Sequence, residues 1–246
     1  MELIYREQVK ITSAHTDGFG KVTPSAILYF AQEAAGRHCL ELGTDWDTLQ
    51  KQNLFWALIR TKVQITKLPT LGQTLTVQTW PMPQTRTAFP RCTVGYDETG
   101  SECFRIIALW VLMDTQNRTM VLPGKSQITV PGILQGNEPD VPKALPALQT
   151  QQFCLRTVEL GELDRNGHMN NTRYLDWVMA LLDSTYHKDH PVKEFTVCYM
   201  AEALAHQQIT LYYRHDGDTL LVDGHREKTN VSDEKQRIFT ASVSFL

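Results

Sequence analysis

Apolar residues recur along the chain with two spacings, and these predict the same elements in each half. The helical spacing of three and four residues occurs at Ile27, Phe30, Ala31 and Ala34 in the first half, and at Tyr174, Val178, Leu181 and Leu182 in the second. Strand-like runs precede the two patterns at residues 8–11 and 156–160. Each half is therefore expected to place one helix after one strand.

Further strand patterns follow each predicted helix. They cover residues 56–66, 73–81, 89–97 and 102–114 in the first half, and 195–201, 206–214, 219–228 and 236–246 in the second. Turn-forming residues at 97–100 and 215–218 separate neighbouring strands. One helix and a long, mostly antiparallel sheet in each half form an α+β arrangement.

The two halves match at one fixed offset. When Asp17 is placed over Asp164 (164 − 17 = 147), Gly20 falls on Gly167, and the strand runs and helix patterns come into line. Self-similarity at a constant offset is the signature of an internal duplication. The sequence therefore predicts one α+β unit used twice.

A stretch rich in proline and glycine separates the halves. Five of the eleven prolines lie in it, at positions 123, 131, 139, 142 and 146, which favours an extended linker over a folded element. Its apolar residues, such as Ile128 and Ile133, are expected to lie along a surface. We expect an N-terminal domain at residues 1–121, a linker at 122–149 and a C-terminal domain at 150–246.

Composition and charge narrow the function classes. Hydrophobic residues make up 42% of the chain, and the formal net charge of −3 gives no reason to expect nucleic acid or an anionic membrane as partner. No apolar run could insert across a bilayer, and the residues after Met1 lack the apolar stretch of a signal peptide. The five cysteines include no C-x-x-C pair, which favours free thiols. We expect a cytoplasmic protein without a metal or cofactor.

The chemically informative segment lies just ahead of the second helix pattern. Asp164, Asn166 and His168 supply a carboxylate, an amide and a group that titrates near neutral pH. Asn170 or Asn171 suits the cap of the following helix, whose N-terminal N–H groups would stabilise a developing oxyanion. A polar turn without chemistry explains the same residue types, because Asp, Asn and Gly are common in turns.

A comparison with the first copy of the duplication distinguishes these two interpretations. It keeps the Asp and the Gly of the turn, yet carries Phe19 in place of Asn166 and Lys21 in place of His168. The turn itself therefore requires neither Asn nor His. This difference favours a functional site in the second copy.

A wider pattern points to a known family. Asp164-x-Asn166-x-His168-x-Asn170-Asn171, followed by Tyr174 and Trp177, resembles the active-site signature of the acyl-acyl-carrier-protein thioesterases of plants and bacteria. Trp80 and residues 86–97 and 108–123 resemble the first-half strands of that family, so the resemblance covers essentially the whole chain. It implies a tandem double hot-dog fold, in which two long antiparallel sheets each wrap a central helix. The N-terminal domain would hold the acyl chain, and the C-terminal domain would be catalytic.

The resemblance also implies a function and its residues. The function is hydrolysis of the thioester of fatty acyl-acyl carrier protein, which releases free fatty acid and ends chain elongation in fatty acid biosynthesis. The implied site residues are Asp164, Asn166, His168 and Glu202, and Lys67 is the nearest counterpart of Glu202 in the first half. Ala203 stands where many plant members carry Cys, which argues against a thiolate nucleophile there. Cys198, five residues earlier, is expected to be a core thiol.

In this assignment His168 and Glu202 activate water or support a carboxylate nucleophile, and both roles of Glu202 stay open. Asn166 would orient the nucleophile or hold the thioester carbonyl, while Asp164 would fix the loop and bias the imidazole. The implied partner is an acyl carrier protein with a phosphopantetheine-linked acyl chain. Arg165 and Arg173 are candidate docking points on the surface. A further homodimer is left open.

Two other functions remain open at this point. A hot-dog hydratase or dehydratase acting on an acyl thioester would also place Asp and His ahead of the central helix, but Glu202 would have no role in it. A non-catalytic acyl-binding module would use His168 only to line a pocket. His187 and His190 have a metal-like spacing, but Pro191 follows and no third ligand is evident, which favours a solvated loop.

Overall fold

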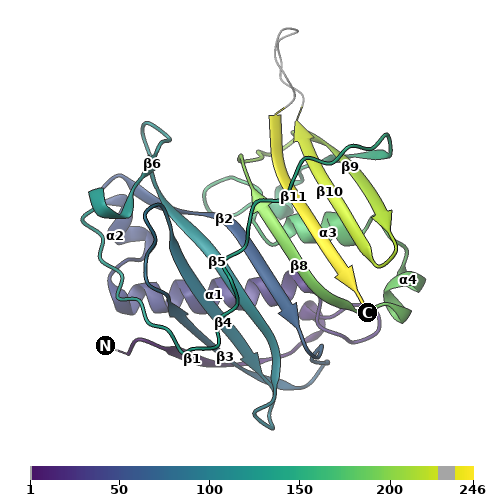
Figure 1. The fold of residues 1–246 in the computed structure, drawn as a ribbon, viewed down its shortest axis with the longest axis horizontal. Coiled ribbons are helices and arrows are strands. Elements are labelled where there is room, and N and C mark those ends of the chain that lie inside the picture. Colours follow the sequence, from purple (N-terminus) through teal and green to yellow (C-terminus); the bar gives the residue numbers. More distant parts are fainter. Residues whose placement is uncertain (1, 227–235) are drawn as a thin grey trace, which may run out of the picture. The chain divides into compact units, whose positions relative to one another are not determined.

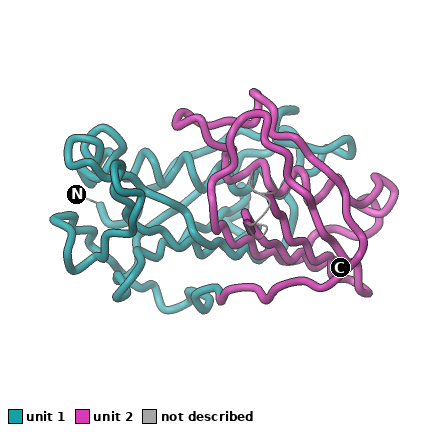
Figure 2. Tube along the Cα trace, turned by 90° about the horizontal axis from the view of Figure 1, so that it is seen from above, with its two compact units in different colours: residues 1–142 teal, residues 143–246 magenta. Residues whose placement is uncertain are grey.

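The computed structural model describes residues 2–226 and 236–246. The chain forms two compact units, unit 1 (Met1–Pro142) and unit 2 (Lys143–Leu246), shown in teal and magenta in Figure 2. Each unit combines one antiparallel sheet with a helix on that sheet, and this helix is long in unit 1 and short in unit 2 (Figure 1). The α+β class expected from the sequence is therefore confirmed.

The sheet of unit 1 has the strand order β1-β3-β4-β5-β2, and all of its neighbouring strands are antiparallel. The strands are β1 (Tyr5–Lys10), β2 (Leu54–Ile65), β3 (Thr74–Pro81), β4 (Phe89–Tyr96) and β5 (Glu102–Asp114). The short strand β6 (Met120–Val121) pairs with β5. The helices are α1 (Pro24–Leu42) and α2 (Trp46–Gln50).

The sheet of unit 2 repeats this order as β7-β9-β10-β11-β8. Its strands are β7 (Phe153–Thr157), β8 (Val192–Tyr199), β9 (Gln208–Asp216), β10 (Thr219–Arg226) and β11 (Gln236–Phe245), and its helices are α3 (Arg173–Met179) and α4 (Ser184–Asp189). Apart from β6, each strand of unit 1 thus has a counterpart at the same place among the described strands of unit 2. The duplication extends from the sequence to the topology.

Helix α1 is fixed at both ends by its sequence. Thr23 caps its first turn by accepting the N–H of Ala26, and Gly43 ends it in the left-handed conformation at φ 66°. Its apolar face, including Ile27 and Phe30, is buried against β1 and β3. This helix is the central element of unit 1.

The second helix is shorter than its apolar pattern predicts. Helix α3 ends at Met179, so Leu181 and Leu182 lie beyond it. Their N–H groups still bond to carbonyls three residues back, which continues the helical spacing through a turn. Asp183 then caps α4 by accepting the N–H of Tyr186. The prediction failed here because a turn and a new helix keep the same periodicity.

Several strand boundaries differ from those predicted. Strand β1 (Tyr5–Lys10) begins three residues before the expected run at 8–11, and β9 (Gln208–Asp216) is shifted by two residues from the expected 206–214. The strand expected at 156–160 is β7 (Phe153–Thr157), because a 3-10 turn at Leu160–Glu162 ends the extended segment. The strand expected at 195–201 is β8 (Val192–Tyr199). The strand expected at 219–228 is described as far as Arg226, and its last two positions lie outside the described residues.

The segment between the sheets has no helix or strand from residue 126 to residue 152. Its apolar residues pack on the units as expected: Ile128 is buried in a cluster with Leu49 and Leu54, and Ile133 packs on a cluster that contains Trp80. Its end is bound to unit 2, where the Leu148 N–H donates to Asp223.

A glycine faces a phenylalanine on the neighbouring strand at the same place in both sheets. Gly95 pairs with Phe104 and Gly224 pairs with Phe239, and a register shift follows each pair. A Cβ atom added at Gly95 would lie 2.4 Å from the ring of Phe104, and one at Gly224 would lie 2.2 Å from the ring of Phe239. Only glycine leaves room for these buried rings.

The Gly224→Ala variant is therefore expected to unfold more easily, by about 1–3 kcal/mol, because the added methyl group overpacks the ring of Phe239. Urea denaturation measures the loss. Gly161→Ala serves as the control, since nothing lies within 4 Å of its added Cβ. Combining Gly224→Ala with Phe239→Leu should cost less than the sum of the two single changes. Additive costs would contradict a direct clash.

Candidate active site

The predicted turn is built on the side chain of Asp164. Its Oδ1 accepts the backbone N–H of Asn166 at 2.8 Å and that of His168 at 3.2 Å. The Asp164 N–H donates to the carbonyl of His168 at 2.7 Å, and Gly167 takes φ 76°. Asp164 therefore fixes the loop through its backbone amides, as the sequence predicts.

Unit 1 contains the same turn without the Asn and the His. Oδ1 of Asp17 accepts the N–H groups of Phe19 and Lys21, both at 2.9 Å, and Gly20 takes φ 72°. The backbone structure of the turn therefore does not depend on the side chains at the Asn166 and His168 positions. The turn folds without an Asn or a His at these two positions.

The structure brings His168 and Glu202 together. His168 Nε2 lies 3.3 Å from Glu202 Oε2, with the imidazole 22% and the carboxylate 41% exposed. A backbone bridge from His168 to Leu204 and a bond from Met169 N–H to the Ala203 carbonyl (2.8 Å) align the two segments. A His–carboxylate pair that solvent can reach is able to take a proton from water.

The counterpart of Glu202 in unit 1 is Leu68, one residue from the Lys67 that the sequence suggests. The N–H of Val22 bonds to the Pro69 carbonyl at 2.9 Å, just as that of Met169 bonds to Ala203. Pro69 therefore matches Ala203, at an offset of 134 (203 − 69), and Leu68 matches Glu202. The offset falls from 147 to 134 because unit 2 has the shorter helical segment, a difference invisible to a fixed-offset comparison.

Asn166 lies on the exposed side of the turn, with its Nδ2 3.4 Å from Asp164 Oδ2. The Asp164 carboxylate bonds the backbone amide of His168 rather than its ring. The expected bias of the imidazole thus comes from Glu202, whose carboxylate is the one beside the ring. The four predicted residues form two pairs, Asp164–Asn166 and His168–Glu202.

The start of α3 does not match the expected oxyanion site. Asn170 Oδ1 accepts the N–H and the hydroxyl of Thr172, both at 3.0 Å, and its carbonyl accepts the Arg173 N–H at 2.9 Å. Two N–H groups at this end are therefore already bonded, and the helix has only seven residues. The N-cap of α3 is Thr172, without a side-chain capping bond, so the expected cap at Asn170 or Asn171 is wrong. Asn170 instead binds the N-cap residue, and the Asn171 carbonyl accepts the hydroxyl of Tyr199.

The aromatic residues of the signature pack behind the site. Tyr174 is buried and makes edge contacts with Phe239 and Tyr199 at centroid distances of 4.8 and 5.5 Å. Burial raises the pKa of the Tyr174 hydroxyl well above its usual range, while the backbone of Ala203 opposes this and the charge of Glu202 adds to it. The phenol therefore stays neutral. Trp177 Nε1 donates to Glu162 at 2.6 Å.

The remaining predicted residues lie outside the His168–Glu202 pair. Cys198 is buried and its thiol contacts the Lys143 carbonyl at 3.9 Å, as expected of a core thiol. The loop expected at His187 and His190 is wrong, because His187 lies in α4 and its Nε2 bonds to the carbonyl of Met179, the last residue of α3. Within the described ranges, no three His, Cys, Asp or Glu side chains are grouped to hold a metal ion. Arg173 is exposed and paired with Asp176 at 3.1 Å.

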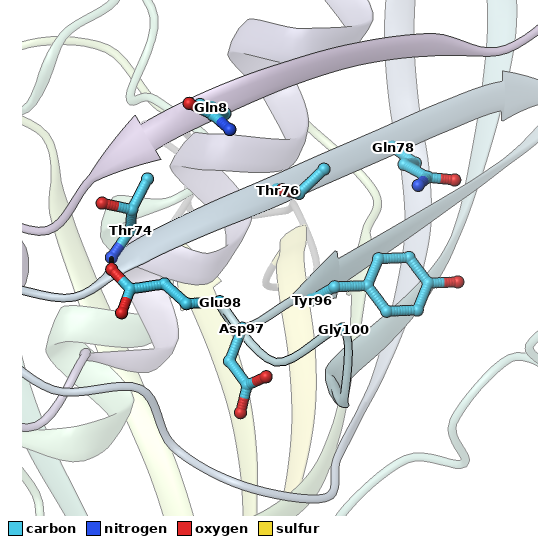
Figure 3. Close-up of a pocket in the computed structure, with 8 residues that line it drawn as sticks. All are labelled: Gln8, Thr74, Thr76, Gln78, Tyr96, Asp97, Glu98 and Gly100. Atoms are coloured by element: carbon cyan, nitrogen blue, oxygen red, sulfur yellow. Dashed lines mark hydrogen bonds between the residues drawn. The ribbon is translucent and has the colours of Figure 1, made fainter.

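A separate groove of about 640 Å³ lies on unit 1, on the sheet face turned away from α1 (Figure 3). Its lining is almost entirely polar and comprises Gln8, Thr74, Thr76, Gln78, Tyr96, Asp97, Glu98 and Gly100. Leu75 and Val77, which alternate with the threonines and Gln78, point to the other face and are fully buried. The groove does not suit an acyl chain.

Comparisons with known proteins identify the family of this chain. The model of the acyl-ACP thioesterase N-terminal domain matches residues 2–123, and that of the acyl-ACP thioesterase C-terminal domain matches residues 147–241. The chain belongs to the acyl-ACP thioesterase family. Its described helices include none long and apolar enough to cross a membrane.

Relatives by sequence are plant enzymes. Oleoyl-acyl carrier protein thioesterase 1 of Arabidopsis thaliana is 23% identical over 81% of this chain and 60% of its own length. Dodecanoyl-[acyl-carrier-protein] hydrolase of Umbellularia californica is 26% identical over 81% of this chain and 56% of its own. The chain thus spans little more than half the length of these relatives.

Solved structures confirm the fold. An acyl-ACP thioesterase from Bacteroides thetaiotaomicron superposes with a TM-score of 0.88 at 20% identity, over 99% of this chain and 98% of that one. The 12:0-ACP thioesterase from Umbellularia californica gives 0.82 at 21% identity, over 100% and 98%. The two units have the same strand order, and each sheet packs on a helix. Together with these matches, this confirms the predicted double hot-dog fold.

Proposed function

We propose that this protein hydrolyses the thioester of a fatty acyl group carried by acyl carrier protein and releases the free fatty acid. The observation that carries the proposal is the contact of 3.3 Å between His168 and Glu202. This contact is made at the Asp164 turn, whereas the matching Asp17 turn of unit 1 has other residues at these positions. The chain belongs to the acyl-ACP thioesterase family. Because the turn forms in unit 1 without this pair, a catalytic role best explains the presence of His168 and Glu202 in unit 2.

The pair is suited to activating water. Glu202, whose carboxylate lies 3.3 Å from the imidazole, takes a proton from water as the water oxygen attacks the thioester carbonyl. Glu202 passes this proton to the imidazole, and His168 gives it to the thiolate sulfur as the C–S bond breaks. Asn166, exposed at the mouth of the turn, is placed to donate an amide N–H to the thioester carbonyl. The Asp164 carboxylate accepts the backbone N–H groups of Asn166 and His168 and so holds these two residues in place.

Direct attack by Glu202 is the alternative route to the same products. Its carboxylate would attack the thioester carbonyl and expel the carrier thiolate, which takes up a proton. The resulting mixed anhydride would then be cleaved by water to the fatty acid and the free Glu202 carboxylate. The absence of Cys at position 203 and the burial of Cys198 favour a carboxylate or a water molecule over a thiolate in either route. The domain roles follow the same proposal, with unit 2 catalytic and unit 1 holding the acyl chain.

The proposed partner is an acyl carrier protein, because the family's relatives are named for acyl-carrier substrates. Arg165 and Arg173 are both exposed near the turn and are the proposed docking residues for an acidic carrier. Since Arg173 is paired with Asp176, its contribution would require exchange of that partner. Pairing of two chains into a homodimer stays a prediction.

The test is product analysis on a chain-length series of acyl-carrier thioesters. We expect free thiol and free fatty acid to appear in equal amounts. Addition of water to a 2-enoyl thioester with the thioester intact would identify a hydratase instead, a function in which Glu202 has no role. Tight acyl binding without turnover on every thioester would identify a binding module.

A further inference from the structure

We propose that Arg226 is a positioning residue that fixes the backbone of Glu202, an inference that rests on the proposed hydrolase function. Nη1 of Arg226 donates to the Glu202 carbonyl at 3.3 Å and to Gln207 Oε1 at 2.5 Å. Its Nη2 donates to Gln236 Oε1 at 2.5 Å. One guanidinium thus ties the segment that carries Glu202 to β10 and β11.

Unit 1 shows which bonds around this segment belong to the shared frame. Gln207 Oε1 also accepts the Leu204 N–H at 2.9 Å, and Gln73 Oε1 accepts the Thr70 N–H at 2.8 Å in the same way. The carbonyls of Ala203 and its counterpart are likewise bonded in both units. These bonds serve the fold, since they are present where no reacting group exists.

The bond from Arg226 has no such counterpart. Thr76 pairs with Tyr96 in unit 1 as Thr210 pairs with His225 in unit 2, so Asp97 is the counterpart of Arg226. A carboxylate cannot donate to a carbonyl, and Asp97 instead accepts a bond from Lys67 at 3.1 Å. The guanidinium therefore occurs only in the copy that also carries the reacting carboxylate.

Glu202 needs such support because its side chain is 41% exposed. An exposed side chain keeps much of its rotamer freedom, so its contact with His168 requires at least that the backbone of Glu202 stays in place. The planar guanidinium holds the Glu202 carbonyl while Gln207 and Gln236 hold the guanidinium. Loss of this support lets the carboxylate leave the imidazole without removing either group.

The test compares Arg226→Ala with Arg214→Ala, an arginine on β9 that pairs with exposed Asp216. For Arg226→Ala, we expect kcat to fall about 10–100-fold with KM within about threefold, the size expected of a misplaced reacting group. Added guanidinium should restore part of kcat in Arg226→Ala. Arg214→Ala should keep full kcat and show no response to guanidinium.

The outcomes separate this inference from the proposed function. Full kcat in Arg226→Ala, or no recovery with guanidinium in the folded variant, overturns the positioning role. Should circular dichroism show that Arg226→Ala is unfolded, Arg226→Lys decides, because an ammonium cannot bridge the Glu202 carbonyl and both glutamines; unchanged kcat there overturns the role. Full activity in His168→Ala would instead overturn the proposed site itself.

Discussion

Replacing His168 by Ala is expected to lower kcat for acyl-carrier thioester hydrolysis by about 10²–10⁴-fold, the usual contribution of a positioned acid or base. Glu202→Gln should fall in the same range, because the amide keeps the shape of the side chain but cannot accept a proton. KM should change little in both variants, since neither group is needed to hold the acyl chain. Steady-state release of free thiol measures all of these values.

The double variant sharpens this prediction. Two groups 3.3 Å apart that act as one unit lose their effect together, so His168→Ala combined with Glu202→Gln should be about as slow as the slower single variant. Lys21→Ala is the matched control, because Lys21 occupies the His168 position in the frame of unit 1. Multiplicative losses in the double variant would contradict a shared proton path.

Replacing Asp223 by Ala is expected to lower the free energy of unfolding by about 3 kcal/mol, because it leaves a paired guanidinium without its anion. Asp223 is 1% exposed and accepts a hydrogen bond from Arg237 Nε at 3.0 Å. Its carboxylate also lies 2.9 Å from Arg237 Nη2 and 3.0 Å from His225 Nε2. Denaturation by urea measures the loss. Asp223→Asn, which keeps the size and one acceptor, should cost less.

The same change should release the segment that leads into unit 2. Asp223 Oδ2 accepts the Leu148 N–H at 3.3 Å, and Arg237 also bonds the Pro146 carbonyl. Hydrogen exchange at Leu148 should therefore quicken in Asp223→Ala. Asp216→Ala is the control, since its pair with Arg214 is exposed and exposed pairs contribute about 0–1 kcal/mol. Equal costs for the two variants would contradict a buried role for Asp223.

Much of the fold could be predicted because apolar periodicity reports burial. The long strands of unit 1 lie within about two residues of their predicted spans, since Leu75 and Val77 alternate with polar neighbours. The duplication could be predicted because its turn needs Asp17 and Gly20 for their conformations, and such residues persist. Helix α3 was overestimated because Leu181 continues the helical spacing outside the helix.

The site could be predicted only where its residues are close in sequence. Asp164, Asn166 and His168 share one turn, so their spacing alone shows that they meet. Glu202 was placed by family resemblance, and its counterpart Leu68 was missed by one residue because the offset changes between the helix and the sheet. Arg226 carries no local signal, since its contact with the Glu202 carbonyl depends on strand register.

The turn built on Asp164 recurs around Asp17 with the same bonds and no reacting group. Stability of the turn is therefore separate from turnover, because the backbone bonds form whatever side chains occupy the two variable positions. A chain that carries this turn twice can therefore change the side chains of one copy without unfolding it. Phe19 and Lys21 show that the turn accepts an aromatic and a cationic side chain at the two variable positions.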